Sequence, residues 1–556
     1  MNTKIKNILI SFSGLAILLV SCKKKLEEYN PGGLTAATVY TNAAGFESLV
    51  NAAYSYSRFW YGKEEGYSVS EMGTDIWTNG TGDVYPQLST YNNLQGANTA
   101  ALTLEWNNFY AAINLCNTGI KAIGEVSDYS AQQKATREGE LRFLRAFYYW
   151  HIVETWGGVH FTTEPTQGVV TTANKTPVET FYNQIFEDLQ FAVTNLPNTA
   201  PAEYGRAWRA VAKAFLARMY LTRGKNAEAI AMANEVINNY GFQLLPRYAD
   251  LWNMGNLKNK EVIWAIDYST NLAYNDLTSS TYPNGHSRGS NSGHLLYLMV
   301  YDQVNTAILI RDINNGRPFN RYMPTLSFLN MFDETMDSRY SGSFQTVWYC
   351  NKAGTSGGNT FVIGDTAAYT PKTTLSPAYI ATRKYTIYDL PKVYNTTTGV
   401  PTQRRFYPSL KKFKDSTRTS IAEAQSARDV FVMRLAEMYL IAAEAELKIG
   451  KTDSAAYYIN IIRTRAALPG QTAAMQITPA QVTLDFILDE RARELSGEQL
   501  RWFDLKRTGK LIDRVKALNP DGTNFIQPFH MVRPIPQTQL DAVSNRNEFT
   551  QNDGYL

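Results

Sequence analysis

Cysteine and histidine are scarce in this sequence, and their positions exclude several kinds of site. The chain has three cysteines, Cys22, Cys116 and Cys350, which are too few for a disulfide framework. Its five histidines form no H-E-x-x-H pattern, and no pair of cysteines accompanies them. We therefore expect no metal centre of the zinc type, because zinc needs clustered nitrogen and sulfur ligands.

Motifs that hold cofactors or activate nucleophiles are also missing. The sequence has no Walker motif and no dinucleotide-binding glycine pattern, so no cofactor is expected. The pentapeptide GSNSG at 289–293 has asparagine where a nucleophile elbow needs serine. A pair of carboxylates for glycoside hydrolysis stays open at this stage, because the separation of such a pair is set in space and not along the chain.

The chain has little excess charge of either sign. Its 54 Lys and Arg residues and 50 Asp and Glu residues give a formal net charge of +4. A nucleic-acid-binding protein needs a strong basic footprint, so we expect no nucleic acid partner. After residue 22 no run of apolar residues approaches the roughly 18 that a membrane-spanning helix needs.

The first residues have the pattern of an export signal. Lys4 and Lys6 precede a mostly apolar run, Ile8–Val20, which is too short to span a bilayer comfortably. The following residues end in Cys22 in the order Leu-Val-Ser-Cys, which is similar to a bacterial lipobox. The sequence therefore predicts a lipoprotein signal peptide over 1–21, a lipidated Cys22, and a mature body tethered to a membrane by acyl chains.

Helix signals dominate the rest of the chain. After Ser130, apolar residues recur at helical spacing from Leu141 to Ile152, and the pattern ends at Trp156-Gly157-Gly158. Three pairs have capping-box spacing and predict helix starts: Ser130 with Gln133, Thr176 with Glu179, and Thr478 with Gln481. Two segments, Ala214–Ile237 and Leu440–Arg463, each combine an alanine-rich helix, a glycine turn and a second helix, as in a degenerate tetratricopeptide hairpin.

Two segments have a different character. Residues 268–427 are rich in Gly, Ser, Thr, Asn and Tyr, and residues 70–93 are similar in composition. Long helical periodicity fades in both segments. Polar, aromatic-bearing segments of this length within a helical frame are typical places for a binding site, because loops carry function while the frame positions them.

One segment, DERARELSGEQLRWFDLKRTGK at 489–510, is dense in both acids and bases. The pairs Asp489–Arg493, Glu490–Arg493 and Arg491–Glu494 stand three or four residues apart, so opposite charges meet on one helix flank. A general acid instead needs isolation in an apolar pocket, which raises its pKa. The pattern predicts a structural ion network in this segment and not a catalytic centre.

Several motifs together resemble the SusD/RagB family of surface lipoproteins. These motifs are LRAFYYWHIVETWGGVHF (144–161), RLAEMYLIAAEAELKIG, the charged segment above, RPIPQTQL and the terminal QNDGYL, and they follow the family's order along nearly the whole mature chain. Two departures are His160, where the family commonly has proline, and the lysines after Cys22 in place of an acid-rich leader.

The resemblance implies a mostly α-helical fold built on four tetratricopeptide-like hairpins. It implies a single domain over 22–556, with the scaffold at about 34–267 and 428–510 and a loop-rich ligand region at about 268–427. It also implies a non-catalytic role, in which the protein captures glycan and delivers it to a SusC-like TonB-dependent transporter. The expected location is the outer membrane, facing the cell exterior through a lipid anchor.

The family's binding residues lie in variable loops, so the candidates here come from residue chemistry alone. A sugar ring can lie on an indole or a phenol while Asp, Asn or Arg bonds its hydroxyls. The predicted ligand-binding residues are Asp75, Trp77, Asn79, Tyr85, Tyr91, Tyr282, Arg288, Asn291, Trp348 and Tyr349. Two other functions stay open: uptake of peptides by a RagB-like member of the same family, and glycoside hydrolysis at the cell surface.

Overall fold

The computed structural model describes residues 39–269, 291–423 and 426–556, and most of its regular structure is helical. Tyr282, Arg288 and Cys22 lie outside the described residues. The longer helices are α3 (Ala43–Ser55), α6 (Ala100–Ala122), α7 (Ala131–Trp156), α8 (Val178–Asn195), α9 (Arg209–Thr222), α10 (Asn226–Asn239), α16 (Leu435–Lys448), α17 (Thr452–Ala466) and α19 (Leu484–Leu495). In the described part of the chain, no helix has the length and apolar character needed to cross a membrane.

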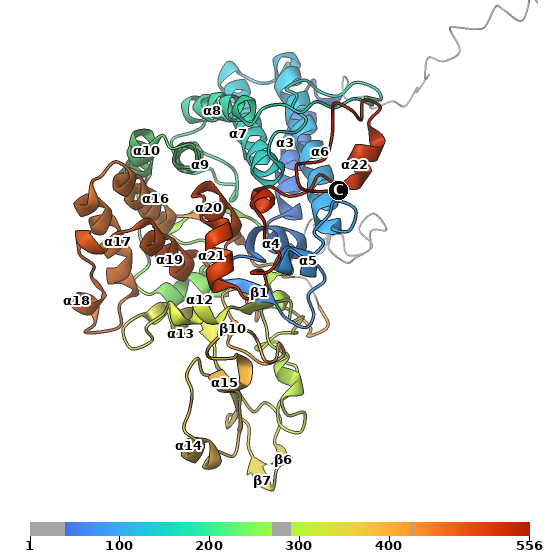
Figure 1. Ribbon diagram of the computed structural model, residues 1–556. Coiled ribbons are helices and arrows are strands. Elements are labelled where there is room, and N and C mark those ends of the chain that lie inside the picture. Colours follow the sequence, from blue (N-terminus) through green and yellow to red (C-terminus); the bar gives the residue numbers. More distant parts are fainter. Residues whose placement is uncertain (1–38, 270–290, 424–425) are drawn as a thin grey trace, which may run out of the picture.

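The long helices form a stack in which each helix packs against the next. Each of the helices α6, α7, α8 and α9 contacts the next helix in the chain. α10 then contacts α16, and α16 contacts α17, while α3 packs on α6 and α7. The stack fills the upper half of the molecule (Figure 1). Successive antiparallel helices bury a shared core between them, which gives a stable frame without a large sheet. The predicted mostly α fold is confirmed.

Both predicted helix hairpins are present. The segment Ala214–Ile237 contains most of α9 and α10, and Leu440–Arg463 contains most of α16 and α17. The turns contain Gly224 and Gly450, whose φ angles of +69° and +81° are unfavourable for residues with a Cβ atom. Ala217, Ala229, Ala443 and Ala455 are fully buried where the paired helices approach.

The three predicted helix starts have different outcomes. Ser130 and Gln133 form the capping box of α7, which ends at Trp156 as predicted. Thr176 caps nothing, because α8 begins after Pro177 and has no side-chain cap. Thr478 and Gln481 form a capping box on a single 3₁₀ turn, and α19 begins later, after the cap Thr483. A helix therefore begins close to Thr176 but without the predicted cap, and the capping box at Thr478 is confirmed but starts only a 3₁₀ turn.

The polar segment enters and leaves the helical frame through one pair of strands. β2 (Val262–Ile266) pairs antiparallel with β11 (Val430–Arg434), and Val430 lies opposite Ile266. Both strands are fully buried, so the ribbon they form is part of the core. Because these two strands pair with each other, the polar segment between them leaves the helical frame and returns to it at the same place.

Between these two strands the described elements are short. They form the lower part of the molecule, with β6 and β7 at its tip (Figure 1). The helices are α11 (Gly293–Leu296), α12 (Leu326–Asn330), α13 (Ser338–Ser343), α14 (Pro377–Ala381) and α15 (Leu390–Val393). The strands are β3 (Tyr322–Pro324), β4 (Phe344–Gln345), β5 (Val347–Tyr349), β6 (Gly354–Ser356), β7 (Asn359–Phe361), β8 (Thr366–Tyr369), β9 (Thr386–Ile387) and β10 (Ser409–Leu410).

Outside that segment, further short elements connect the frame to it and to the C-terminal part. They are β1 (Trp77–Asn79), α4 (Glu64–Glu71), α5 (Pro86–Thr90), α18 (Thr472–Met475), α20 (Arg501–Arg507), α21 (Leu511–Leu518) and α22 (Gln537–Ala542). β1 pairs antiparallel with β3, so the polar segment at 70–93 is joined to the loop-rich region by a strand pair. The two segments that were predicted to carry function are therefore neighbours in space.

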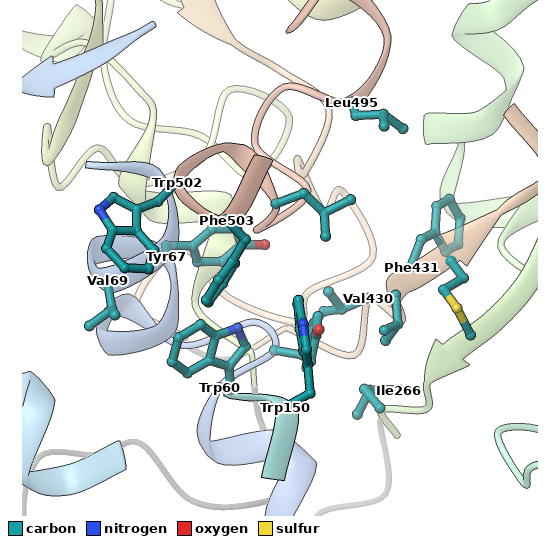
Figure 2. Packing of buried hydrophobic residues seen from close by; sticks show 14 of the residues in the cluster. Trp60, Tyr67, Val69, Trp150, Ile266, Val430, Phe431, Leu495, Trp502 and Phe503 are labelled. Atoms are coloured by element: carbon teal, nitrogen blue, oxygen red, sulfur yellow. The ribbon is translucent and has the colours of Figure 1, made fainter. Parts of the chain in front are cut away.

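The core joins segments that are far apart in the sequence. Trp60, Trp150 and Phe503 come from three separate regions, and the Phe503 ring lies 4.8 Å from that of Trp150 and 5.9 Å from that of Trp60 (Figure 2). The same view shows Ile266 and Val430 of the buried ribbon beside this group. Aromatic pairs at such distances add stability beyond the area that they bury.

The C-terminal motifs hold the end of α7. Arg533 of RPIPQTQL is buried, with its guanidinium 4.7 Å above the Trp502 ring, and its backbone N–H donates to the carbonyl of Thr155. Asn552 of QNDGYL donates to the carbonyls of Trp156 and Arg533. These motifs close the frame by bonding to the end of the longest helix, which is a structural role.

The charged segment forms a buried ion network. Glu490 and Glu494 are fully buried on α19, and Arg339, also fully buried, donates to both carboxylates at 2.8 and 3.1 Å. Burial alone would raise the pKa of Glu494, but the guanidiniums of Arg465 and Arg434 outweigh it and lower that pKa to about 2. Such acids stay ionised at neutral pH and cannot donate a proton in catalysis. The predicted structural role is confirmed.

The partners in this network differ from those predicted. Glu490 and Arg493 do pair along α19, at 2.6 Å. Asp489 instead pairs with Arg514, and Arg491 pairs with Asp504 at 2.6 Å. Two of the three expected contacts within the helix are thus replaced by contacts between elements, because Arg491 and Glu494 are buried and Asp489 faces Arg514 of α21.

Candidate functional site

The two tryptophans predicted as sugar platforms lie in the core. Trp77 is fully buried, and its ring packs 4.8 Å from Tyr297 and 5.3 Å from Phe328. Trp348 is fully buried as well, stacked on Tyr301 at 4.4 Å with the two rings 9° from parallel. Neither indole offers a face to a ligand in this structure, because the strands that carry them turn both rings inward.

Three other predicted residues are also committed to internal contacts. Asp75 is fully buried and accepts hydrogen bonds from Arg501 and Arg514. Tyr91 is almost fully buried, and its hydroxyl donates to the carbonyl of Gly73 at 2.8 Å. Asn291 is buried, and its amide donates to the carbonyl of Arg428 at 2.6 Å. These three side chains bond to other parts of the protein and hold the loops in place, so in this structure they are not available to a ligand.

Three predicted residues are accessible. Tyr349 is 55% exposed on β5, and Asn79 and Tyr85 are partly exposed near the strand pair β1–β3. The Tyr85 hydroxyl donates to Glu65 at 3.2 Å. Asn79 accepts a hydrogen bond from Arg404 at 3.1 Å. Their role in binding stays a prediction.

Asn79 and Tyr85 belong to a surface of rings and guanidiniums made by three loops and by Tyr388, which lies between β9 and α15. We call it the loop surface. It comprises Asn79, Tyr85, Phe319, Arg321, Tyr388, Arg404, Arg405 and Phe406, all of which are partly or fully exposed. It lies where the helical frame meets the lower part of the molecule, close to β1 and β3 (Figure 1).

Backbone contacts bring the three loops together. The N–H of Gly80 donates to the carbonyl of Arg321 at 2.7 Å, and the N–H of Gly82 donates to the carbonyl of Asn320 at 2.9 Å. The side chain of Asn320 in turn donates to the carbonyl of Arg405 at 3.3 Å. A Cβ atom at Gly80 or Gly82 would collide with the 319–320 backbone, so only glycine permits this close approach.

The guanidiniums on the loop surface are held in fixed positions. Arg404 bonds Asp521 at 2.7 Å and the carbonyl of Asn79 at 2.8 Å. Arg321 bonds Glu64 at 2.5 Å and lies over the Phe319 ring at 4.9 Å. Anchored cations of this kind can donate hydrogen bonds to a ligand at little further entropic cost.

The rings on the loop surface are paired. Tyr388 stacks on Phe406 with ring centroids 4.4 Å apart, and the Arg405 guanidinium lies 5.5 Å from the centre of the Phe406 ring. Partly exposed rings held in this way present fixed apolar faces beside polar donors. That combination suits a ligand with both an apolar face and many hydroxyl groups.

The acids near the loop surface are buried and paired. Burial raises the pKa of Glu64 to about 7, although Arg321 beside it acts in the opposite direction. Burial also raises the pKa of Tyr85, with a further contribution from Glu65. Among the described residues no group of His, Cys, Asp and Glu has the arrangement of a metal site.

Sequence reasoning missed six residues of the loop surface. They are Phe319, Arg321, Tyr388, Arg404, Arg405 and Phe406. The sequence did contain a signal, because arginine and aromatic residues alternate in RPFNRY at 317–322 and RRF at 404–406. Without the pairing of β1 with β3, nothing in the sequence joined these two stretches to the segment at 70–93.

Comparisons with known proteins agree on one family. A family model described as the SusD family matches residues 260–555, and a second, described as "Starch-binding associating with outer membrane", matches residues 44–221. "SusD-like protein P25" of Formosa agariphila is 26% identical over 575 residues, covering 99% of this chain and 100% of the relative. A "SusD-like protein" of Bacteroides ovatus is 25% identical, covering 90% of this chain and 82% of the relative.

Solved structures have the same fold. A "Laminarin binding SusD-like protein" superposes with a TM-score of 0.71 at 23% identity, covering 92% of this chain and 100% of that chain. "Surface glycan-binding protein A from Bacteroides thetaiotaomicron in complex with laminarihexaose" superposes with a TM-score of 0.67 at 19% identity, covering 92% and 99%. At these identities the likeness concerns the fold.

Proposed function

The chain belongs to the SusD family, and from that membership and the loop surface we propose that it is a non-catalytic glycan-binding protein of the outer membrane. The observation that carries the proposal is the family match over more than half of the chain. One solved relative is a laminarin-binding protein and another is in complex with laminarihexaose, so these two glycans are the first ligands to test.

The loop surface supports glycan binding by its chemistry. The exposed parts of the Phe319 and Phe406 rings can contact the C–H groups of a sugar, while Arg405 and Asn79 supply hydrogen bonds to its hydroxyls. The pairing of Arg321 with Glu64 and of Arg404 with Asp521 leaves little net charge at these two positions. The exposed Arg405 bonds the amide oxygen of Gln303 and keeps its charge, so the surface suits a neutral polyhydroxylated ligand better than a cationic one.

The two buried glutamates of the charged segment support a role without catalysis. Glu490 and Glu494 are ionised and buried among arginines. A glycosidase needs two carboxyl groups that face the same substrate, one of them free to donate a proton. These acids are instead held in ion pairs within the fold.

We further propose delivery of the bound glycan to a SusC-like TonB-dependent transporter, from a lipid-anchored position on the cell exterior. The support is the family membership together with the export signal that ends at Cys22. A single acyl chain holds a protein at a membrane only weakly, so stable anchoring requires more than one chain.

The lipid anchor has a direct test. When the protein is expressed in a Bacteroidetes host fed a radiolabelled fatty acid, we expect label on the wild-type chain and none on Cys22→Ala. Cys116→Ala is the control and should keep the label, because Cys116 is buried in the folded chain. Equal labelling of wild type and Cys22→Ala would contradict the anchor.

The loop surface is tested by removing its rings. We expect the triple variant Tyr85→Ala, Phe319→Ala, Phe406→Ala to bind laminarin at least about 30-fold more weakly, because each lost ring contact contributes on the order of 1 kcal/mol. The measurement is affinity electrophoresis in laminarin gels, followed by titration calorimetry with laminarihexaose. Tyr457→Ala is the matched control, since that ring is 64% exposed on α17 of the helical frame.

The same samples distinguish the alternatives. A peptide-binding protein would be favoured if titration calorimetry showed heat of binding with mixed peptides but none with laminarin, cellulose, starch or mannan oligosaccharides. An increase in reducing ends during incubation with glycan would favour a hydrolase. An unchanged affinity of the triple variant for the glycan that the wild type binds would move the site away from the loop surface while leaving the family membership intact.

A further inference from the structure

A second hollow lies on the helical frame. It is a cleft of about 470 Å³ between α6, the loop that follows α7, and the C-terminal segment with α22. α6 and α22 lie together at the upper right of the molecule, whereas the loop surface is near β1 and β3 below (Figure 1). The two regions share no residue. A cleft of this size falls in the range of small-ligand sites, about 300–1,000 Å³.

The walls of the cleft are bonded to one another. Tyr110 on α6 donates to the carbonyl of His160 at 2.6 Å, and Gln539 on α22 donates to Asn107 on α6 at 3.1 Å. The loop is also fixed to the C-terminal segment, because the N–H of Ala173 donates to Asn545 at 3.1 Å. A ligand would therefore enter a shape that already exists, which lowers the entropic cost of binding.

One side of the cleft is aromatic. The ring of Tyr110 lies 4.8 Å from that of Trp106, and the ring of Phe549 lies 6.4 Å from that of Trp106. Trp106 and Phe549 are nearly buried, whereas Tyr110 is partly exposed. Tyr110 is therefore the ring on which the face of a ring-shaped ligand can lie, with Trp106 packed against it.

The rest of the lining is polar but nearly uncharged. Amide and hydroxyl groups come from Asn107, Thr162, Thr166, Gln167, Thr172 and Gln539. The one carboxylate among the described lining residues, Glu164, is exposed and paired with Lys121 at 2.8 Å. Burial lowers the pKa of His160, which favours the neutral imidazole at neutral pH. No described lining residue is a lysine or an arginine.

We propose that this cleft is a second carbohydrate site, which takes a short neutral oligosaccharide independently of the loop surface. An aromatic base surrounded by amides and hydroxyls matches a ligand with apolar ring faces and many hydroxyl groups. The near absence of charge disfavours anionic glycans and peptides, whose termini and side chains would be left unpaired. The site goes beyond the proposed function and stands on its own geometry.

The test fills the cleft without touching its buried rings. Ala542, the last residue of α22, is exposed and lines the cleft, so Ala542→Trp places an indole inside it. Ala381→Trp is the matched control, because Ala381 is the last residue of another short helix, α14, and is exposed in the lower part of the molecule. Thermal midpoints of both variants should equal that of the wild type.

The readout is titration calorimetry with laminaritriose, cellotriose, maltotriose and mannotriose. In the loop-surface triple variant, we expect at least one trisaccharide to bind still, and we expect Ala542→Trp in that background to weaken it at least tenfold. Ala381→Trp should leave it unchanged. If the triple variant binds none of the four, or if Ala542→Trp leaves every affinity unchanged, the cleft is not a carbohydrate site. If only the loop-surface proposal is wrong, the triple variant will bind laminarin as tightly as the wild type does.

Discussion

Replacing Arg434 by methionine is expected to destabilise the folded protein by about 3–5 kcal/mol, because the change removes a guanidinium that three carboxylates share in the core. The Arg434 guanidinium bonds Glu261 at 2.9 Å, Glu494 at 2.7 Å and Glu498 at 2.8 Å. Glu261 and Glu494 are fully buried, so water cannot replace the lost charge. Methionine has a similar length, which limits the effect of lost packing.

The effect is measured by urea unfolding at neutral pH, followed by circular dichroism. Arg247→Met is the matched control: the same change is made at a side chain that is 79% exposed and paired with Asp250 at 2.7 Å. An exposed pair contributes little, so we expect a change of less than about 1 kcal/mol there. If both variants lost the same free energy, the network around Arg434 would not be a main source of stability.

Trp77→Ala is the second variant with a large expected effect, a loss of about 3–5 kcal/mol in the free energy of unfolding. The fully buried indole fills space between Tyr297 and Phe328, and its removal leaves a cavity that the surrounding rings can fill only in part. Differential scanning calorimetry should show a clearly lower thermal midpoint. A surface residue that serves ligand binding would show the opposite pattern, with little change in stability and a large change in affinity.

Two companion variants make this result decisive. Trp77→Phe keeps a ring in the core, so we expect a smaller loss of stability and an affinity for glycan within about twofold of the wild type, a difference below about 0.5 kcal/mol. Tyr349→Ala removes a ring that is 55% exposed and should change stability by about 0.5 kcal/mol or less. A tenfold loss of affinity in Trp77→Phe at unchanged stability would restore Trp77 as a sugar platform.

The charged segment at 489–510 shows how far local reasoning extends. Spacing identified α19 and its buried face, on which Leu488, Ala492 and Leu495 point into the core. The conclusion that its charges are structural was also available from the residues, since acids and bases alternate along it. The ion-pair partners of these charges could not be read from the segment, because Arg339 and Arg434 lie more than 50 residues earlier in the chain.

For the candidate site, the sequence predicted the region but not which of its residues are exposed. Composition located the two polar segments, 70–93 and 268–427, and the pairing of β1 with β3 places them side by side. Composition did not separate exposed rings from buried ones: Trp348 and Tyr349 are adjacent, yet the first is fully buried and the second is 55% exposed. In a short strand successive side chains point to opposite faces, and only the packed structure decides which face is covered.

The sequence alone determined the helical hairpins, the long polar excursion between them, the structural character of the ion network and the family. These features depend on spacing, on glycine turns such as Gly224 and Gly450, and on motifs that are contiguous in the chain. Only the tertiary structure decided which rings face solvent, which arginines neutralise Glu494, and where α6, α22 and the loop between 159 and 177 enclose a cleft. Exposure and ion pairing depend on contacts between distant segments, and no local pattern in one sequence encodes them.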